Sequence, residues 1–173
     1  MKRVLIKSES PIFIGEYPYH QQLKNELVPL LENYSDKQGR MTNVQATMTE
    51  WDWGKDIPSV KKFKKYILNK VPVLISHGGA IYSTDYRDFW GNIYHKNDCT
   101  YKHNHLPYYM SFVYFLKAKW YNSSLVFTDY DQKVRPIEGR YVIFPSHLQH
   151  HVPKHRFKQT RMTLSGNISI HEL

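Results

Sequence analysis

The second half of the chain, from residue 73 onward, is a succession of short β-prone runs separated by turns rich in Asn, Asp, Gly and Lys. In order, the runs are VLISHGGAIYS, DFWGNIYH, YYMSFVYFL, SSLVFTDY, GRYVIFP and RMTLSGNISI. Several short strands at this spacing are typical of a β-sandwich or a barrel. One of them has clear bounds, because Gly139 begins a turn into residues 140–144 and Pro145 ends the strand. This half therefore predicts a β-core.

The first 72 residues are expected to be mainly helical. The elements expected here are one or two short strands within residues 1–18, broken by Pro11 and ended by Pro18, a helix at about 19–34 that Pro29 bends or interrupts, a strand within 42–51, and a helix entered through Pro58 and Ser59. Helices that come first and strands that follow favour helices packed outside a β-core. We therefore predict an α+β fold, mainly β, with a jelly-roll-like core and the N-terminal helices outside it.

The length suits one domain with its own hydrophobic core, because 173 residues bury enough apolar surface for that and the composition does not change along the chain. Aromatic residues make up 15% of the chain, which argues against disorder and favours a β-rich protein. We expect a single domain over residues 1–173, with a helical part at about 1–72 and the β-core at about 73–170.

Cysteine usage and hydropathy bear on location. The single cysteine, Cys99, excludes an internal disulfide, and no apolar signal segment follows Met1, so we expect a cytoplasmic protein. No apolar run approaches the roughly 20 residues that a membrane-spanning helix needs. The sequence therefore predicts no association with a membrane.

The net charge of +9 is compatible with a nucleic acid, an acidic partner or an anionic substrate. Much of it lies in SVKKFKKYILNK, residues 59–70, where Val60, Phe63, Ile67 and Leu68 fall on one helical face and lysines cover the other. Such a helix usually packs through its apolar side and leaves the basic side in solvent. Because no arginine-rich arm, aromatic RNA-binding signature or zinc finger accompanies it, nucleic-acid binding is the weaker interpretation.

Two histidines stand two residues apart in YKHNHLPYYMSFVYFL, residues 101–116. Successive strand side chains alternate faces, so His103 and His105 project the same way and could share a metal, or could be polar residues on the wet face of a sheet. Downstream, residues 136–168 hold four further histidines and Arg161. In a closed jelly roll, strands distant in sequence face each other across the interior, which would let the pair meet a later histidine.

Three motifs carry a resemblance to a known family. HNHLPYYMSFVYFL, RPIEGRYVIFPSHLQHHV and RMTLSGNI correspond in order to the patterns HxHP…LSGVYYL, P..G..V.FPS.L.H.V and RISI.FNI of a bacterial and phage group. On these motifs the chain resembles the 2-oxoglutarate/Fe(II)-dependent oxygenases over about residues 88–170. The resemblance implies a double-stranded β-helix, which is a jelly-roll or cupin-like core. It also implies an enzyme that hydroxylates a C–H bond and releases succinate and CO₂.

The resemblance also implies site residues and cofactors. His103 matches the first metal histidine, His105 falls where most of these oxygenases have a carboxylate, and His150 matches the distal histidine. Arg161, eleven residues after His150, falls where a basic residue binds the far carboxylate of 2-oxoglutarate, and its bidentate guanidinium suits that role. The implied cofactors are Fe(II), 2-oxoglutarate and O₂. Further contacts to 2-oxoglutarate are expected from three residues: Thr163, Asn92 and Tyr94.

The HxH pattern departs from the usual site of two histidines and one carboxylate. Either three imidazoles hold the metal, or a carboxylate such as Asp129 or Asp131 completes the site; we favour His103, His105 and His150. His151 should point the opposite way from His150 in an extended segment, which predicts a surface position. The same surface position is expected for two further histidines, His147 and His155.

Other functions remain open from the sequence. A cupin-type metalloprotein fits GRYVIFPSHLQH but lacks the glutamate expected after HxH, and a three-histidine zinc enzyme is a further alternative. Neither needs Arg161. The non-enzymatic alternative is a basic binding module. The substrate, a protein side chain or a small molecule, and the oligomeric state are not readable from the residues; the loops 76–88 and 116–124 are candidate lids.

Overall fold

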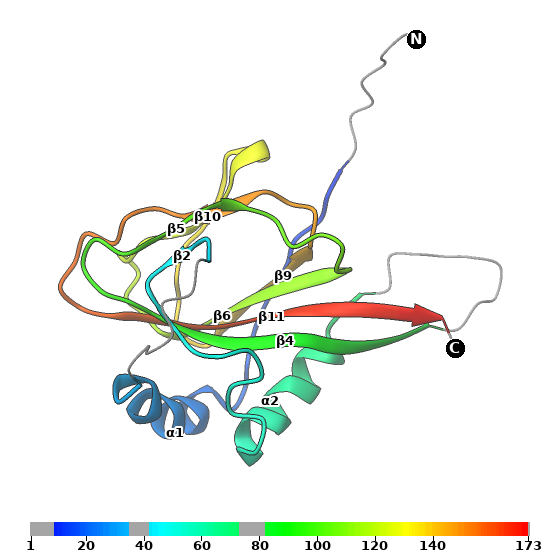
Figure 1. The fold of residues 1–173 in the computed structure, drawn as a ribbon, viewed down its shortest axis with the longest axis horizontal. Coiled ribbons are helices and arrows are strands. Elements are labelled where there is room, and N and C mark those ends of the chain that lie inside the picture. Colours follow the sequence, from blue (N-terminus) through cyan, green and yellow to red (C-terminus); the bar gives the residue numbers. More distant parts are fainter. Residues whose placement is uncertain (1–8, 35–41, 73–81, 173) are drawn as a thin grey trace, which may run out of the picture.

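The computed structural model describes residues 9–34, 42–72 and 82–172 (Figure 1). Its elements in chain order are β1 (Phe13–Glu16), α1 (His20–Glu32), β2 (Val44–Gln45), β3 (Thr47–Met48), α2 (Pro58–Leu68), β4 (Tyr82–Tyr94), β5 (Cys99–His103), β6 (Met110–Lys117), β7 (Leu125–Phe127), the 3₁₀ helix η1 (Thr128–Tyr130), β8 (Gln132–Val134), β9 (Arg140–Pro145), β10 (His150–Val152) and β11 (Arg161–Glu172). Strands therefore dominate after the two helices, as the sequence predicts.

The strands form two antiparallel sheets that lie one above the other (Figure 1). The larger sheet has the order β1-β9-β6-β11-β4-β3, and the smaller sheet has the order β2-β5-β10-β7-β8. Neighbours such as β11 and β4, or β10 and β5, are far apart in sequence, which is the arrangement of a jelly roll. The predicted jelly-roll core is thus confirmed.

Both helices lie on the outer face of the larger sheet (Figure 1). The lysine-rich helix buries Val60, Phe63 and Ile67, while most of its lysines remain exposed, as the amphipathic pattern indicates. The first helix continues through Pro29 and is not interrupted there. Within the described residues, neither helix has the length and apolar character needed to cross a membrane.

Strand alternation divides the larger sheet into two faces. On β6, Phe112 and Tyr114 face the helices and pack against Phe63, whereas Phe115 belongs to the core between the sheets. The face of the larger sheet that looks toward the smaller sheet also carries polar residues of β4 and β11. An apolar core under the helices therefore supports a sheet whose other face is partly polar.

Two expectations about the N-terminal part and the loops change with the structure. The strand expected within 42–51 is split, because β2 pairs with β5 in the smaller sheet and β3 pairs with β4 in the larger one. This segment therefore bridges the two sheets. Of the candidate lid 76–88, residues 76–81 lie outside the described residues, and residues 82–88 belong to β4. The other candidate lid, 116–124, begins within β6 and connects it to β7.

Candidate active site

Three histidines from two distant segments of the chain come together between the sheets. His103 ends β5, His105 follows it by two residues, and His150 begins β10. The antiparallel pairing of β10 with β5 sets His150 opposite His103. One ligand atom of each of these three histidines lies within 4.8 Å of the others. The structure thus brings together the three residues that the sequence selects as metal ligands.

Backbone carbonyls orient two of the rings. His103 Nδ1 lies 2.7 Å from the Tyr101 carbonyl oxygen, and His150 Nδ1 lies 2.9 Å from the Leu148 carbonyl oxygen. A carbonyl only accepts hydrogen bonds, so each Nδ1 carries the proton and each Nε2 keeps its lone pair for a ligand. The loop that carries His105 is fixed by a hydrogen bond from its backbone N–H to the Ser146 carbonyl, 2.8 Å away.

The environment keeps the three imidazoles unprotonated. Burial, followed by the proximity of His150 and His103, lowers the pKa of His105 to about 2. Burial is also the main cause that lowers the pKa of His150 to about 3, and it lowers the pKa of His103. Metals bind the neutral imidazole, so at neutral pH all three side chains are in the form that a metal needs.

The histidines face a small cavity of about 40 Å³ between the sheets. Its lining comes from both sheets and from His105 in the loop after β5: Val44, Trp90, Asn92, Tyr94, Thr100, His103, His105, Phe112, Val113, Leu125, His150, Val152, Arg161, Thr163 and Ser165. The four residues expected to contact 2-oxoglutarate are all among them. A metal ligand set and a group of polar residues thus line the same cavity.

Arg161 is the buried cation of this cavity. Its side chain is only 1% exposed, and its guanidinium carbon lies 4.6 Å from the centre of the Tyr94 ring and 5.3 Å from that of Phe115. None of its three nitrogen atoms has a hydrogen-bond partner among the described residues. Burial lowers the pKa of Arg161 and the neighbouring Tyr94 opposes that shift, and a guanidinium remains charged in proteins. A buried cation without a partner is stabilised when an anion binds to it, and a carboxylate matches the forked geometry of the guanidinium.

The polar residues next to Arg161 come from the register of two neighbouring strands. On β4 and β11, Tyr94 lies opposite Arg161 and Asn92 lies opposite Thr163. The Asn92 amide nitrogen lies 3.3 Å from the Thr163 hydroxyl and 3.3 Å from the Ser165 hydroxyl. Its buried carbonyl oxygen has no partner among the described residues, and so remains available to a ligand in the cavity.

The carboxylates considered as alternative ligands do not join the histidine cluster. Asp129 lies on η1, is exposed, and forms an ion pair with Lys102 at 3.4 Å. Asp131 is exposed and lies 3.9 Å from Lys133. Within the described residues, the metal-binding group contains histidines alone. The structure therefore favours the three-imidazole set over a set completed by either aspartate.

The other three histidines of residues 136–168 do not all lie at the surface, where they were expected. His147 is exposed and contacts the Ser10 hydroxyl at 3.1 Å, and His151 is partly exposed, with burial lowering its pKa. The surface position expected for His155 is wrong, because this side chain is fully buried. Its Nε2 lies 2.7 Å from the Gln159 carbonyl, and its backbone pairs with the loop at Asn97 and Asp98. His155 therefore fastens the β10–β11 connection to the β4–β5 turn.

Trp90 is a cavity residue that the sequence reasoning did not select. It is 4% exposed, its ring centre lies 6.1 Å from that of His105, and its Nε1 has no partner among the described residues. A signal for it exists in the sequence. Once Asn92 and Tyr94 are assigned to the cavity, the strand alternation of WGNIY places residue 90 on the same face.

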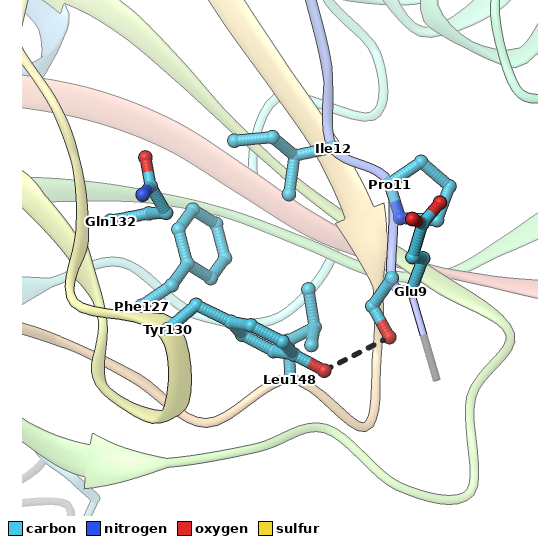
Figure 2. Close-up of a pocket in the computed structure, with 8 residues that line it drawn as sticks. Glu9, Pro11, Ile12, Phe127, Tyr130, Gln132 and Leu148 are labelled. Atoms are coloured by element: carbon cyan, nitrogen blue, oxygen red, sulfur yellow. Dashed lines mark hydrogen bonds between the residues drawn. The ribbon is translucent and has the colours of Figure 1, made fainter. Parts of the chain in front are cut away.

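A second pocket is an open groove of about 480 Å³. Figure 2 shows the residues that line it. Phe127 and Leu148 line this groove, and both are also neighbours of His150: the Phe127 ring lies 6.2 Å away, and Leu148 supplies the carbonyl that orients the imidazole. On the far side, the Tyr130 hydroxyl reaches toward Ser10 at 3.5 Å (Figure 2). Packing in this groove therefore supports a ligand of the histidine cluster.

Comparisons with known proteins agree with this architecture. No family model matches the sequence, and no curated protein matches it. Among solved structures, a Pseudomonas putida prolyl-4-hydroxylase is similar with a TM-score of 0.70 and 16% identity, over 92% of each chain. The viral collagen prolyl hydroxylase of Paramecium bursaria Chlorella virus-1, in complex with 2-oxoglutarate, has a TM-score of 0.60 and 15% identity, over 91% of this chain and 94% of that one.

A third similar structure is HygX from Streptomyces hygroscopicus, with nickel, 2-oxoglutarate and hygromycin B bound. Its TM-score is 0.68 at 9% identity, over 92% of this chain and 83% of that one. The likeness in all three cases is one of fold. The chain is thus similar in its jelly-roll fold to these three proteins.

Proposed function

We propose that this chain is an Fe(II)- and 2-oxoglutarate-dependent dioxygenase that hydroxylates a C–H bond of its substrate. The observation that carries the proposal is the pairing, in one cavity, of three unprotonated imidazoles with a buried guanidinium that lacks a partner. Two similar folds whose structures hold 2-oxoglutarate, one of them together with nickel, support the same assignment.

The residues fit an iron centre and its cosubstrate. We assign His103, His105 and His150 as metal ligands through nitrogen lone pairs, and Arg161 as the residue that binds the far carboxylate of 2-oxoglutarate. Thr163 and Asn92 are proposed as polar contacts, and Tyr94 as the ring that supports the guanidinium. When bound, iron and 2-oxoglutarate supply the activation of O₂, with succinate and CO₂ as products of the cosubstrate.

The protein supplies placement and protection from water. Backbone carbonyls fix two imidazole rings, which sets the direction of their free nitrogens. Phe144 packs at 4.9 Å from the His150 ring, and Val152 and Leu125 close the cavity on the side of the smaller sheet. Such a wall keeps solvent from the reacting atoms and limits side reactions.

The first test is to mix anaerobic protein with Fe(II) and 2-oxoglutarate and to look for the visible charge-transfer band of the chelate. We expect a band that disappears in His150→Ala and weakens in Arg161→Ala. His147→Ala is the matched control, because that histidine is exposed and lies outside the cluster. Absence of any band in protein that holds iron would contradict the proposal.

A zinc enzyme is the second candidate, since the donor set has three imidazoles and lacks a carboxylate. Such a set has one negative charge fewer than the usual iron site and also suits Zn(II). Metal analysis of protein purified without added metal separates the two, together with a test for 2-oxoglutarate consumption. Activity with bound zinc and without 2-oxoglutarate would favour the second candidate.

The substrate is proposed to be a protein side chain or a small molecule. One fold neighbour is a prolyl hydroxylase in complex with a peptide fragment, from Trichoplax adhaerens, and another is HygX with hygromycin B, so this fold serves both kinds of ligand. We propose that residues 1–173 act as one catalytic unit, because both helices pack on the sheet that carries Arg161. The free Cys99 and the need to keep iron as Fe(II) suit a reducing compartment such as the cytoplasm.

A further inference from the structure

A line of aromatic rings connects the histidine cluster to the protein surface. The Trp51 ring lies edge-on to the Trp90 ring at a centre distance of 4.8 Å, and Trp90 lies 6.1 Å from His105. The His105 ring in turn lies 4.8 Å from His103 and 5.0 Å from His150. Trp90 is 4% exposed and Trp51 is 45% exposed, so the series begins at the candidate metal centre and ends in solvent.

The chemistry of these two side chains differs from that of the other aromatic rings in contact with the histidines. Phe144 and Phe127 also approach His150, but a phenyl ring does not give up an electron readily. Indole is among the side chains that are oxidised most easily. Trp53, by contrast, is buried in the core that faces the helices, and Trp120 packs on Tyr121. Trp51 and Trp90 therefore form the tryptophan route that contacts the cluster within the described residues.

We propose that Trp90 and Trp51 form an electron relay that returns the metal centre to its resting state when O₂ is activated without substrate. This inference rests on the proposed oxygenase function. Conversion of 2-oxoglutarate and O₂ to succinate and CO₂ leaves one oxygen atom and two oxidising equivalents, which a substrate C–H bond would consume. In the absence of substrate, two electrons and two protons convert that oxygen atom to water.

Each electron passes from Trp51 at the surface to Trp90 and then to the metal centre. Trp90 gives one electron to the centre and becomes a radical cation, Trp51 reduces Trp90, and a soluble reductant such as ascorbate reduces Trp51. Two such cycles, with two protons from solvent, complete the reduction. The buried Trp90 Nε1 has no acceptor among the described residues, so its proton stays on the ring and reduction by Trp51 restores the indole without a proton transfer. Trp51 is exposed enough to meet the reductant.

The test incubates protein with Fe(II), 2-oxoglutarate and O₂ in the absence of substrate, with and without ascorbate. It measures succinate, and it measures oxygen addition to each tryptophan by peptide mass spectrometry. Without ascorbate we expect oxidation of Trp51 several-fold above that of Trp120, although Trp120 is the more exposed at 71%. Ascorbate should suppress the oxidation of Trp51.

Two variants sharpen the test. In Trp51→Phe, oxidation should move to Trp90, and ascorbate should protect several-fold less. In Trp90→Phe, which retains an aromatic ring in the buried position, Trp51 should remain intact. Trp120→Phe is the matched control and should behave as the wild type, and His150→Ala reports oxidation by iron that is free in solution.

The outcomes separate the relay from the function on which it rests. Succinate formation with no preference for Trp51 over Trp120, or with full ascorbate protection in Trp51→Phe, would overturn the relay and leave the oxygenase in place. If no succinate forms in the wild type although iron is bound, the oxygenase proposal fails and the relay fails with it.

Discussion

Replacement of Arg161 by Met should weaken the binding of 2-oxoglutarate without destabilising the fold. The guanidinium is 1% exposed, and its nitrogens have no partner among the described residues. Loss of one partner from a buried charge pair costs about 2–5 kcal/mol, so 2-oxoglutarate should bind roughly 30-fold to several thousand-fold more weakly. Met has a similar length and flexible packing, so the cavity keeps its shape.

The free energy of unfolding without ligand should change in the opposite direction. A buried polar group without a partner costs about 1–3 kcal/mol, and more if it is charged. Stacking on Tyr94 and Phe115 offsets part of that cost, by about 0.5–2 kcal/mol. The variant should therefore be more stable by about 1 kcal/mol, which for a chain of this size raises Tm by about 2–4 °C.

Isothermal titration of the Fe(II)-loaded protein with 2-oxoglutarate and thermal unfolding of the metal-free protein measure the two effects. Arg161→Lys should bind 2-oxoglutarate with intermediate affinity, because it keeps the charge but loses the fork. Arg140→Met is the control, since Arg140 lies 4.0 Å from Glu16 and outside the cavity. A variant at position 161 with lower Tm and unchanged affinity would show that Arg161 supports the fold and does not bind the cosubstrate.

Three further changes follow from the site. His105→Asp adds a negative charge beside the metal, and its attraction to the metal is worth several kcal/mol even at an effective dielectric of about 20. The variant should bind Fe(II) at least about tenfold more tightly, and competition with Zn(II) measures the change in affinity. His150 has a pKa of about 3 in the folded protein and an ordinary value of 6.5, so the metal-free protein should lose stability as pH falls below 6.5, by about 2 kcal/mol at pH 5. Denaturation of His150→Gln at several pH values should show a smaller loss, and an equal loss in the variant and the wild type would contradict the assignment. Leu148→Ala, at a 2% exposed position between the groove and His150, should cost about 2–5 kcal/mol; differential scanning calorimetry tests this, and a loss below 1 kcal/mol would contradict tight packing there.

The sequence by itself determined the features that depend on local pattern. A β-prone run bounded by the turn residues Gly139 and Pro145 defines β9, and the apolar face at Val60, Phe63 and Ile67 defines α2. These features depend on neighbours within a few residues. The resemblance of three motifs added the pairing of His103 and His105 with His150 and Arg161, and the structure places all four in one cavity.

Tertiary structure decided what depends on contacts between distant strands. The sequence could not show that residues 42–51 divide between the two sheets, because either half can form a strand and only the available sheet edges select its partner. His155 is buried because the β10–β11 connection folds onto Asn97 and Asp98, which no local pattern encodes. Trp90 meets His105 because β4 and the end of β5 face each other across the cavity. Alternation fixes which side of a strand a residue occupies, whereas sheet pairing fixes what it meets there.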